Sequence, residues 1–378
     1  MRIGIDLIWV KVGKNGGAES YIRNLLDGFS KYADKNKINF ILFLSKDNHE
    51  SFNKYFKDIN FKKVILPIKS EKVFYRIIKE NLLLDRYAKK EKIDLMFVPV
   101  YSKPLMKNKK IPYIITIHDL QALHYPEYFS KIKNIWLRFA YKRCAKTADR
   151  IIAISNYVKK DIEDKLDIDS KKISVIYNPI SGLENISDFK KLKEKYNIEE
   201  NKYYYTVSSL LPHKNLKTLL YVIKKIKEEK YNIPNKLVIS GVGGKSETEI
   251  KELINKLDIK NEIILTGFIS NEERNSLYKN ANIFLFPSIF EGFGMPPIEA
   301  MYFGTPVITT TKASLYEITK GKAFYVDDPF KIELWIKKIL EVNNKNEYFC
   351  ENFEEYNLIK ITNEYLNLFL EVGKENDL

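Results

Sequence analysis

Short apolar runs alternate with helix-length segments along almost the whole chain. Apolar runs of this length, bounded by polar or turn residues, are typical of buried strands. Parallel strands need long crossover connections, usually helices, so this alternation predicts an α/β fold in which parallel sheets are flanked by helices. In the first half of the chain the predicted strands are 2–8, 38–44, 95–101, 113–120, 150–155 and 173–178. In the second half they are 203–209, 236–241, 262–267, 282–288, 306–310 and 323–326.

The runs fall into two consecutive sets, which indicates two similar domains. The chain has 378 residues, and one domain commonly holds roughly 100–200 residues. We expect an N-terminal domain at 1–180 and a C-terminal domain at 181–355, joined near 177–180. Segment 188–202 is predicted to be the first helix of the second domain. The last segment, 356–378, is expected to form a helix that returns to the first domain.

Composition is that of a globular protein without a membrane span. Hydrophobic residues make up 45% and charged residues 30% of the chain, which is ordinary for a globular domain. No apolar run approaches the roughly 18 residues of a membrane-spanning helix, and the first residues read as a strand rather than as a signal peptide. The two cysteines, Cys144 and Cys350, have no disulfide-framework or zinc-type spacing. We therefore expect a cytoplasmic protein.

Positive charge is concentrated in the first half of the chain. The net charge is +14, and residues 1–180 hold 36 Lys and Arg against 20 Asp and Glu. Within that half, residues 51–150 hold 23 basic and 9 acidic residues. An imbalance of this size indicates an anionic partner, and nucleic acid, an anionic membrane and a phosphorylated acceptor are all compatible with it. The alternative is a lysine-rich surface that faces only water.

Two segments of this basic half have a mixed apolar and basic composition. Segments 73–90 and 128–146 interleave Phe, Tyr, Trp and Leu with Lys and Arg. A basic helix with an apolar face is typical of a helix that lies on an anionic membrane. We therefore expect residues 51–150 to contact an anionic membrane surface, at the inner face of the plasma membrane. In the alternative, the apolar residues are core contacts and the lysines a solvated face.

A glycine turn and a histidine in the first half are candidates for a site. Gly16 and Gly17 precede the predicted helix at 20–33, and a glycine turn at a helix N-terminus can hold an anion on backbone N–H groups. His118 ends the predicted strand at 113–120, and ligands in open α/β sheets gather beyond the carboxyl ends of strands. A structural turn and a structural histidine are the alternative interpretations.

The strongest motif of the chain is FPSIFEGFGMPPIEAMYFGTPVITT, at 286–310. Glycines follow the strand, and Pro296 and Pro297 suit the first turn of a helix, where a missing N–H costs nothing. The backbone amides at 293–295 can then bind an anion at the helix N-terminus. Glu291 precedes these amides and can accept from sugar hydroxyls, whereas Glu299 can accept two hydrogen bonds from a vicinal diol such as a ribose. The motif predicts a site for a diphosphate, a ribose and a sugar.

These segments together resemble a known family. The sequence is similar to the GT-B nucleotide-sugar glycosyltransferases of glycosyltransferase family 4, a retaining family that includes mannosyltransferase-like enzymes of bacterial surface polysaccharides. The most specific match is the E-x(7)-E pattern from Glu291 to Glu299. The resemblance implies two Rossmann-like doubly wound parallel-sheet domains with a donor/acceptor cleft between them. Matching segments in the same order are GGAES, TIHDL, ADRIIAISNYVKKDI, VIYNPI, LLPHKNL, LTGFIS and AFYVDD.

The resemblance implies a transfer of a hexosyl group, with mannose favoured, from a nucleotide-diphosphate sugar to a saccharide or lipid-linked saccharide acceptor. His118 would hydrogen-bond the transferred sugar and assist the transition state, and Glu291 would contact the sugar. Gly16 and Gly17 would lie near the donor diphosphate and the acceptor. The further donor-binding residues that it implies are Ser209, Lys214, Phe268, Ile269, Phe293, Gly294, Met295 and Glu299.

Within that set, Lys214 would hold the diphosphate and Glu299 the ribose, while the backbone near 268–269 would meet the base. The amides at 293–295 would bind sugar hydroxyls and phosphate. The sequence departs from the family pattern in one place: many members carry an Arg a few residues before the Lys, where this chain has Ser208 or Ser209. This departure puts the diphosphate contact, and the choice of donor, in question.

The same resemblance implies that no cofactor or metal takes part, since GT-B enzymes generally bind no catalytic metal. No carboxylate of the sequence is placed as a nucleophile, so the two-carboxylate scheme of hydrolases does not transfer. The family expectation is a same-face attack in which the donor phosphate takes the acceptor proton.

Other functions remain open at this point. A sugar-nucleotide epimerase shares the fold, although HDL and PHKNL in this order favour the transferase. A basic nucleic-acid-binding protein would explain the charge, but no helix-turn-helix, RRM or OB signature is found, and we expect no nucleic-acid partner. A catalytically silent sugar-binding protein is disfavoured by the intact His118 and Glu291.

Overall fold

A computed structural model describes residues 1–102, 111–241, 245–345 and 353–375. Part of the basic segment 51–150, residues 103–110, therefore lies outside the described residues, as do 242–244 of the glycine turn after the strand at 236–241. The chain divides into two compact units. Unit 1 is Met1–Pro179 with Glu354–Leu378, and unit 2 is Ile180–Phe353.

Unit 1 is built on a parallel sheet of seven strands in the order β3-β2-β1-β4-β5-β6-β7. The strand order reverses between β1 and β4, and such a place is called a switch point. The loops that follow these two neighbouring strands run in opposite directions there. The strands are β1 (Arg2–Asp6), β2 (Asn39–Leu44), β3 (Phe61–Ile65), β4 (Leu95–Val98), β5 (Tyr113–Ile117), β6 (Arg150–Ala153) and β7 (Ile173–Val175).

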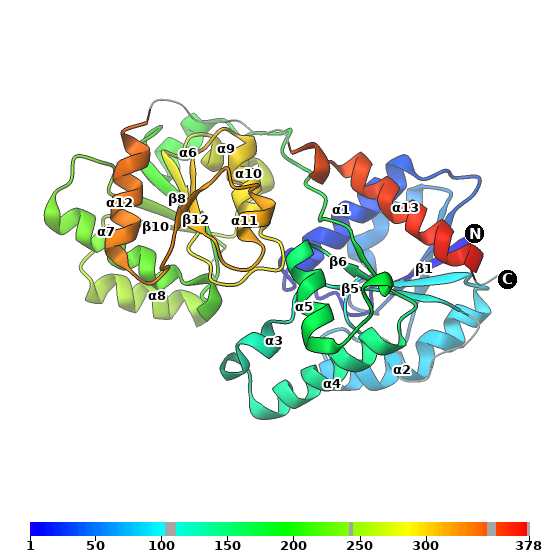
Figure 1. Ribbon diagram of the computed structural model, residues 1–378. Coiled ribbons are helices and arrows are strands. Elements are labelled where there is room, and N and C mark those ends of the chain that lie inside the picture. The colour runs from blue at the N-terminus through cyan, green and yellow to red at the C-terminus, as the bar shows by residue number, and fades with distance from the viewer. Residues whose placement is uncertain (103–110, 242–244, 346–352, 376–378) are drawn as a thin grey trace. The chain divides into compact units, whose positions relative to one another are not determined.

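Helices cover both faces of this sheet (Figure 1). One face packs on α1 and α13, which lie side by side and bury an aromatic core that includes Phe29, Phe40 and Tyr365. Right-handed crossovers on the two sides of the switch point place α2, α4 and α5 on the other face. The helices are α1 (Gly17–Tyr32), η1 (His49–Lys57), α2 (Val73–Lys90), α3 (Gln121–His124), η2 (Pro126–Tyr128), α4 (Lys131–Thr147), α5 (Asn156–Leu166), η3 (Ser170–Lys172), η5 (Glu354–Tyr356) and α13 (Leu358–Glu375).

Unit 2 repeats the plan with a parallel sheet of six strands in the order β10-β9-β8-β11-β12-β13, so its switch point lies between β8 and β11. Its core includes the fully buried Trp335. The strands are β8 (Tyr203–Val207), β9 (Lys236–Ser240), β10 (Ile263–Gly267), β11 (Ile283–Leu285), β12 (Val307–Thr310) and β13 (Phe324–Val326). The helices are α6 (Phe189–Tyr196), η4 (Pro212–Lys214), α7 (Leu216–Glu229), α8 (Lys245–Lys256), α9 (Asn271–Lys279), α10 (Met295–Tyr302), α11 (Leu315–Ile318) and α12 (Ile332–Asn343).

The two parallel α/β sheets confirm the predicted fold class. Every strand proposed from the sequence is present, although most end earlier than proposed. One strand, β3, has no counterpart in the sequence prediction. Its residues FKKVI place Lys62 in water, and it forms the edge of the sheet. An edge strand with lysines lacks the continuous apolar run of a central parallel strand.

The chain crosses between the units twice. The first crossing is between Pro179 and Ile180, where the sequence predicted a boundary after residue 180. The second comes after Phe353, and residues Glu354–Leu378 belong to unit 1, where α13 packs on α1. None of the described helices is long and apolar enough to cross a membrane.

Candidate functional site

An ion pair occupies the switch point of unit 2. Lys214 ends the short helix η4 after β8, and Glu291 lies on the loop after β11, the neighbouring strand. The Lys214 Nζ lies 2.7 Å from Glu291 Oε1, and the two side chains are 23% and 12% exposed. The two residues that were assigned to the diphosphate and to the sugar are thus brought into direct contact.

The loop that carries Glu291 is held in place by a serine from a neighbouring loop. The Ser314 Oγ lies 2.9 Å from the carbonyl oxygens of both Glu291 and Phe293. Gly294 caps α10 with a φ of 95°, and a Cβ at this position would lie 2.8 Å from the Leu315 side chain. Only glycine satisfies both the backbone angle and the space. The first N–H groups of a helix have no carbonyl partner within it. Pro296 and Pro297 have no N–H, so in the first turn of α10 Met295 is the residue that can offer one to an anion beside Glu291.

A histidine links the two loops of the switch point. The carbonyl oxygen of His213 accepts hydrogen bonds from the Ile289 amide at 2.8 Å and from the Ser288 hydroxyl at 3.1 Å. Burial, and secondly the charge of Lys214, lower the pKa of the His213 imidazole to about 4. The ring is therefore neutral near pH 7, so Lys214 is the cation at this point of the site.

Glu299 lies within α10 and is held by two residues of α9. The Tyr278 hydroxyl donates to Glu299 Oε2 at 2.9 Å, and the Arg274 Nε lies 3.6 Å from the same oxygen. Both contacts recorded for the described residues use Oε2, so Oε1 is available to accept from a ligand hydroxyl. Burial, and secondly the charge of Glu299, raise the pKa of Tyr278 well above its ordinary value. The hydroxyl therefore keeps its proton and stays a donor.

Ser209, Phe268 and Ile269 also follow strands at the carboxyl edge of this sheet. Ser209 comes after β8, and Phe268 and Ile269 come after β10 at the far end of the strand order. The Phe268 side chain is 79% exposed. In the described part of the chain, no recorded contact joins these three residues to Lys214, Glu291 or Glu299, so the base-binding position stays a prediction.

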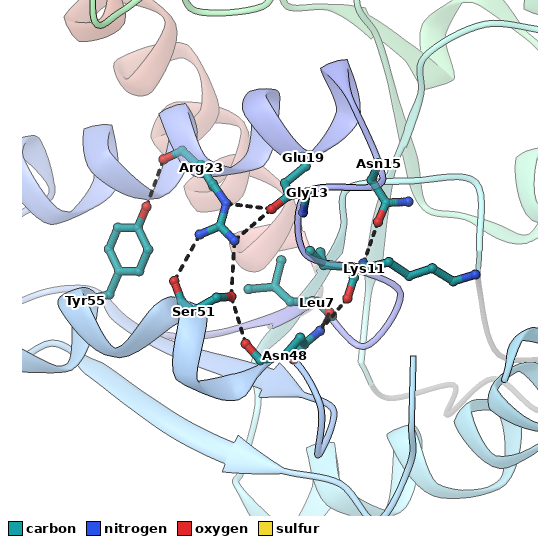
Figure 2. A network of polar contacts seen from close by, with 10 residues as sticks. Leu7, Lys11, Gly13, Asn15, Glu19, Arg23, Asn48, Ser51 and Tyr55 are labelled. Atoms are coloured by element: carbon teal, nitrogen blue, oxygen red, sulfur yellow. Dashed lines mark hydrogen bonds and ion pairs between the residues drawn. The ribbon is translucent and has the colours of Figure 1, made fainter. Parts of the chain in front are cut away.

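In unit 1, the glycine turn before α1 is fixed by a polar network (Figure 2). The Asn48 amide donates to the carbonyl oxygens of Leu7 and Val10 at 2.8 and 2.9 Å. Glu19, in the first turn of α1, accepts from the Gly13 amide at 2.8 Å. It also accepts from two guanidinium nitrogens of Arg23, at 2.8 and 3.0 Å.

This network sets the start of α1 at the predicted glycines. Gly16 is the N-cap, with a φ of 52° and a ψ of −131°, and Gly17 is the first helical residue. A Cβ on Gly16 would meet no atom within 4 Å, so the turn opens into unfilled space. The glycine turn and the helix N-terminus thus lie where the sequence predicted them, and the binding of an anion there stays a prediction.

His118 follows β5 and is packed into a defined orientation. Its Nε2 lies 2.9 Å from the Pro99 carbonyl oxygen, which comes directly after β4. Because a carbonyl only accepts, Nε2 carries the proton and Nδ1 is the acceptor nitrogen. Burial lowers the pKa of His118 to about 4, so the imidazole is neutral near pH 7.

The orientation of His118 depends on residues that are far away in sequence. Its ring and the Tyr21 ring pack in a T-shaped arrangement, with 4.8 Å between the ring centroids and 88° between the ring planes. The Tyr21 hydroxyl in turn pairs with the Thr116 hydroxyl at 2.9 Å and with the Tyr365 hydroxyl of α13 at 2.6 Å. The C-terminal helix therefore supports the candidate catalytic histidine of the first domain.

Asp6, the last residue of β1, lies near a buried ion pair of α2. Glu80 of α2 accepts from Arg76 Nη1 at 2.7 Å and from the Ser102 hydroxyl at 2.7 Å. Burial, and secondly the charge of Glu80, raise the pKa of Asp6 well above its ordinary value. Asp6 therefore retains its proton more readily than an exposed aspartate.

Several residues that hold the candidate site together were not predicted from the sequence. Ser314, Tyr278, Arg274 and Asn48 lie in unremarkable segments, and their contacts span 21 to 41 residues of sequence. Two faint signals exist: Ser314 follows β12 at the same sheet edge, and Arg274 and Tyr278 share one face of α9 by their four-residue spacing. No cluster of three or more His, Cys, Asp or Glu side chains suited to a metal occurs among the described residues.

Comparisons with known proteins cover both units. Residues 15–181 match the family model described as Glycosyltransferase Family 4, and residues 188–358 match the model described as Glycosyl transferases group 1. The chain is 34% identical over 238 residues to the O-antigen chain mannosyltransferase RfbU of Salmonella typhimurium, covering 62% of each chain. It is 26% identical to O-antigen chain mannosyltransferase B of Escherichia coli, covering 60% of each. Both matches span less than two thirds of the relatives' length.

Solved structures with the same fold cover nearly the entire chain. A sucrose-phosphate synthase from Thermosynechococcus elongatus superimposes with a TM-score of 0.76 at 16% identity, covering 98% of this chain and 99% of that one. HepE of Anabaena, in complex with UDP and glucose, superimposes with a TM-score of 0.72 at 18% identity, covering 98% and 100%. The chain therefore belongs to the GT-B glycosyltransferases of family 4, with a family 4 region followed by a group 1 glycosyl transferase region.

Proposed function

We propose that the protein transfers a hexosyl group, with mannose favoured, from a nucleotide-diphosphate sugar to a saccharide or lipid-linked saccharide acceptor. The transfer would serve assembly of a cell-surface polysaccharide at the cytoplasmic face of the plasma membrane. The observation that carries the proposal is the Lys214–Glu291 pair, 2.7 Å apart, beside the N-terminus of α10. The mannosyltransferase names of two relatives support the choice of sugar.

Unit 2 would bind the donor. Lys214 and the backbone amides at 293–295 would hold the diphosphate, Glu291 the sugar hydroxyls and Glu299 the ribose diol. Departure of a nucleoside diphosphate leaves negative charge on its terminal phosphate, and a fixed cation with a helix N-terminus stabilises that charge as it grows. The base would lie against residues 268–269. No metal is part of this proposal.

Unit 1 would present the acceptor. His118 is neutral near pH 7, with Nδ1 as an acceptor for a hydroxyl of the transferred sugar. In the reaction, the bond from the sugar C1 to the donor phosphate oxygen breaks while the acceptor oxygen bonds to C1 on the same face. The acceptor proton passes to the leaving phosphate oxygen, and the nucleoside diphosphate departs.

A donor panel tests the proposal. GDP-, UDP- and dTDP-sugars are added to the intact protein, and protection against thermal unfolding is measured, since a ligand that binds only the folded state raises its apparent stability. We expect one nucleotide class to protect, and the effect to be lost in Lys214→Ala but kept in Lys217→Ala, an exposed lysine of α7. Protection by no nucleotide sugar would contradict the proposal.

A further inference from the structure

A depression rich in lysine lies in unit 1, outside the candidate site described above. It has a volume of about 450 Å³. Lys46 and Lys69 lie on loops that follow β2 and β3, and Lys72 is the N-cap of α2. The depression is therefore on the carboxyl edge of the sheet, the edge that also carries Gly16 and His118. Its lining residues are Lys46, Pro67, Lys69, Lys72, Tyr75 and Lys79.

Among the residues that the structure describes, the lysines of this pocket are not paired with carboxylates. Within the described ranges, no carboxylate forms an ion pair with Lys46, Lys69, Lys72 or Lys79. The Lys79 Nζ lies 4.6 Å from the centroid of the Tyr75 ring.

Two carboxylates nearby have other partners. Asp47 accepts from the amide and hydroxyl of Ser70, at 2.8 and 3.1 Å, which ties the two lysine-bearing loops together. Glu71 pairs with Lys14 at 3.1 Å. The pocket is therefore a positively charged concavity on loops that are tied to each other, and charge complementarity calls for a multiply charged anion.

An exposed apolar stripe adjoins this pocket along α2. Phe74, Ile78 and Leu82 follow one another at four-residue spacing, so they share one face of the helix. Their exposed fractions are 79%, 44% and 63%. The other face of α2 is anchored by the buried Glu80 and Leu84, so the stripe is held toward solvent.

We propose that the lysine pocket binds the diphosphate of a lipid-linked saccharide acceptor, with the lipid chain lying on the apolar stripe of α2. This inference rests on the proposed function and names the acceptor class for it. A diphosphate diester carries two negative charges on adjacent phosphates, which matches four lysines better than the single charge of a phosphatidylglycerol headgroup does. An apolar stripe beside a cationic pocket fits an amphiphile rather than a soluble saccharide.

The position of the pocket fits an acceptor whose saccharide extends toward His118. In the strand order, β2 lies three positions from β5, the strand that His118 follows. At about 4.8 Å between neighbouring strands, the two sites are roughly 14 Å apart along the edge. This spacing leaves room for the saccharide part of the acceptor between the diphosphate and the transferred sugar.

Binding of the intact protein to vesicles tests the inference. Phosphatidylcholine vesicles are compared alone, with phosphatidylglycerol, and with a long-chain polyprenyl diphosphate at matched anionic charge. We expect the strongest co-sedimentation with the diphosphate vesicles, and competition by inorganic diphosphate. Equal binding to the two anionic vesicle types would overturn the diphosphate assignment. Binding of inorganic diphosphate without vesicle binding would overturn the lipid part.

Charge-reversal variants locate the site. The double variant Lys69→Glu/Lys72→Glu should reduce binding to diphosphate vesicles by roughly 30-fold or more. The control, Lys57→Glu/Lys171→Glu, makes the same change of charge elsewhere in unit 1. Lys57 and Lys171 precede β3 and β7, so they lie at the amino edge of the sheet. Equal losses in the two double variants would overturn the assignment to the pocket. Lys69→Gln/Lys72→Gln repeats the test without introducing acids.

The apolar stripe is tested in the same way. Phe74→Ser should weaken vesicle binding but retain competition by inorganic diphosphate, whereas Ile59→Ser, at a side chain 89% exposed, should change neither. Vesicle binding unchanged in Phe74→Ser would overturn the role of the stripe. Thermal protection by the donor nucleotide sugar is measured on every variant, so that loss of the acceptor site is distinguished from failure of the proposed transferase function.

Discussion

The Lys214–Glu291 pair shows how two residues of opposite charge can serve one ligand. An ammonium has three donor hydrogens, and the recorded contact with Glu291 Oε1 uses one of them. When no ligand is bound, each charge is paired with the other. An unpaired buried charge would cost several kcal/mol. A phosphate can therefore bind to Lys214 without displacing Glu291, and the pair is arranged for a ligand that carries both an anion and hydroxyls.

The assignment of Glu299 to a ribose leads to a prediction about nucleotide affinity. Glu299→Ala should weaken nucleoside diphosphate binding by about 1.5–3 kcal/mol, the scale of a hydrogen bond to a charged group. Tyr278→Phe removes only the hydroxyl that donates to Oε2, so we expect a smaller loss. Titration calorimetry with the free nucleoside diphosphate measures both. Unchanged affinity in a folded Glu299→Ala protein would remove the ribose role.

The low pKa of His118 leads to a prediction about stability and pH. The folded-state pKa of about 4 lies below the unfolded value of 6.5, because burial disfavours the charged ring. The contribution of His118 to the free energy of unfolding is therefore complete above pH 6.5 and is lost as pH falls toward 4. Urea unfolding across this range should show a steeper loss for the natural protein than for His118→Gln, whose side-chain amide is uncharged and can also donate to the Pro99 carbonyl oxygen. Parallel losses would contradict the buried neutral imidazole.

At the scale of elements, the start of α10 is decided by a few consecutive residues. Gly294 takes a left-handed backbone, and Pro296 lies in the first turn, where its missing N–H has no helical partner to lose. Ser314, from the loop before α11, then fixes the preceding carbonyls. A helix N-terminus is thereby placed beside the ion pair of the switch point.

This arrangement predicts the effect of a single methyl group. Gly294→Ala should lower the free energy of unfolding by about 1–3 kcal/mol through backbone strain, with a further cost because its Cβ would lie 2.8 Å from Leu315. Nucleotide affinity should fall as well, because the backbone amides of Gly294 and Met295 shift. Gly182→Ala is the control: Gly182 has a φ of 76°, but the atom nearest to the added Cβ lies at 3.7 Å, an ordinary contact. If both variants kept the same nucleotide affinity, the amides at the start of α10, those of Gly294 and Met295, would not be part of the donor site.

At the scale of the whole molecule, α13 shares one hydrophobic core with β1 and α1. Tyr365 of α13 is fully buried, and its ring lies 5.7 Å from that of Phe97 in β4 and 5.9 Å from that of Phe369. Its hydroxyl pairs with Tyr21, which packs on His118. The fold of unit 1 and the orientation of its candidate catalytic residue therefore both depend on the last helix.

Removing this ring should destabilise unit 1 severely. Tyr365→Ala is expected to lower the free energy of unfolding by about 3–5 kcal/mol, the usual cost of a buried aromatic truncation. Tyr365→Phe should cost only about 0.5–1.5 kcal/mol, the net value of one hydrogen bond. Ile359→Ala on the same helix, at a side chain 45% exposed, should be nearly neutral. Denaturant unfolding of the three variants checks this order, and a tolerated Tyr365→Ala would contradict the role of α13 in this core.

Patterns that are local in sequence predicted the backbone well, because they depend on neighbouring residues. The alternation of apolar runs with helical segments specified parallel sheets, and the glycines and prolines of 292–297 specified where α10 begins. The edge strand β3 was not predicted, because its two lysines break the apolar run. His118 and the motif at 286–310 were found by the same means, since loops after parallel strands lie on one edge, whereas Ser209, Phe268 and Ile269 came from the family resemblance.

Tertiary structure alone decided which of these side chains meet. Lys214 and Glu291 are 77 residues apart, and they pair because β8 and β11 are neighbours in the sheet. Tyr21 and Tyr365 are 344 residues apart, and they pair because α13 packs on α1. The sequence by itself determined the elements and the edges on which chemistry can occur, since local sterics and periodic burial set those. Which charges and hydroxyls face each other followed only from strand order and helix packing, to which distant residues contribute jointly.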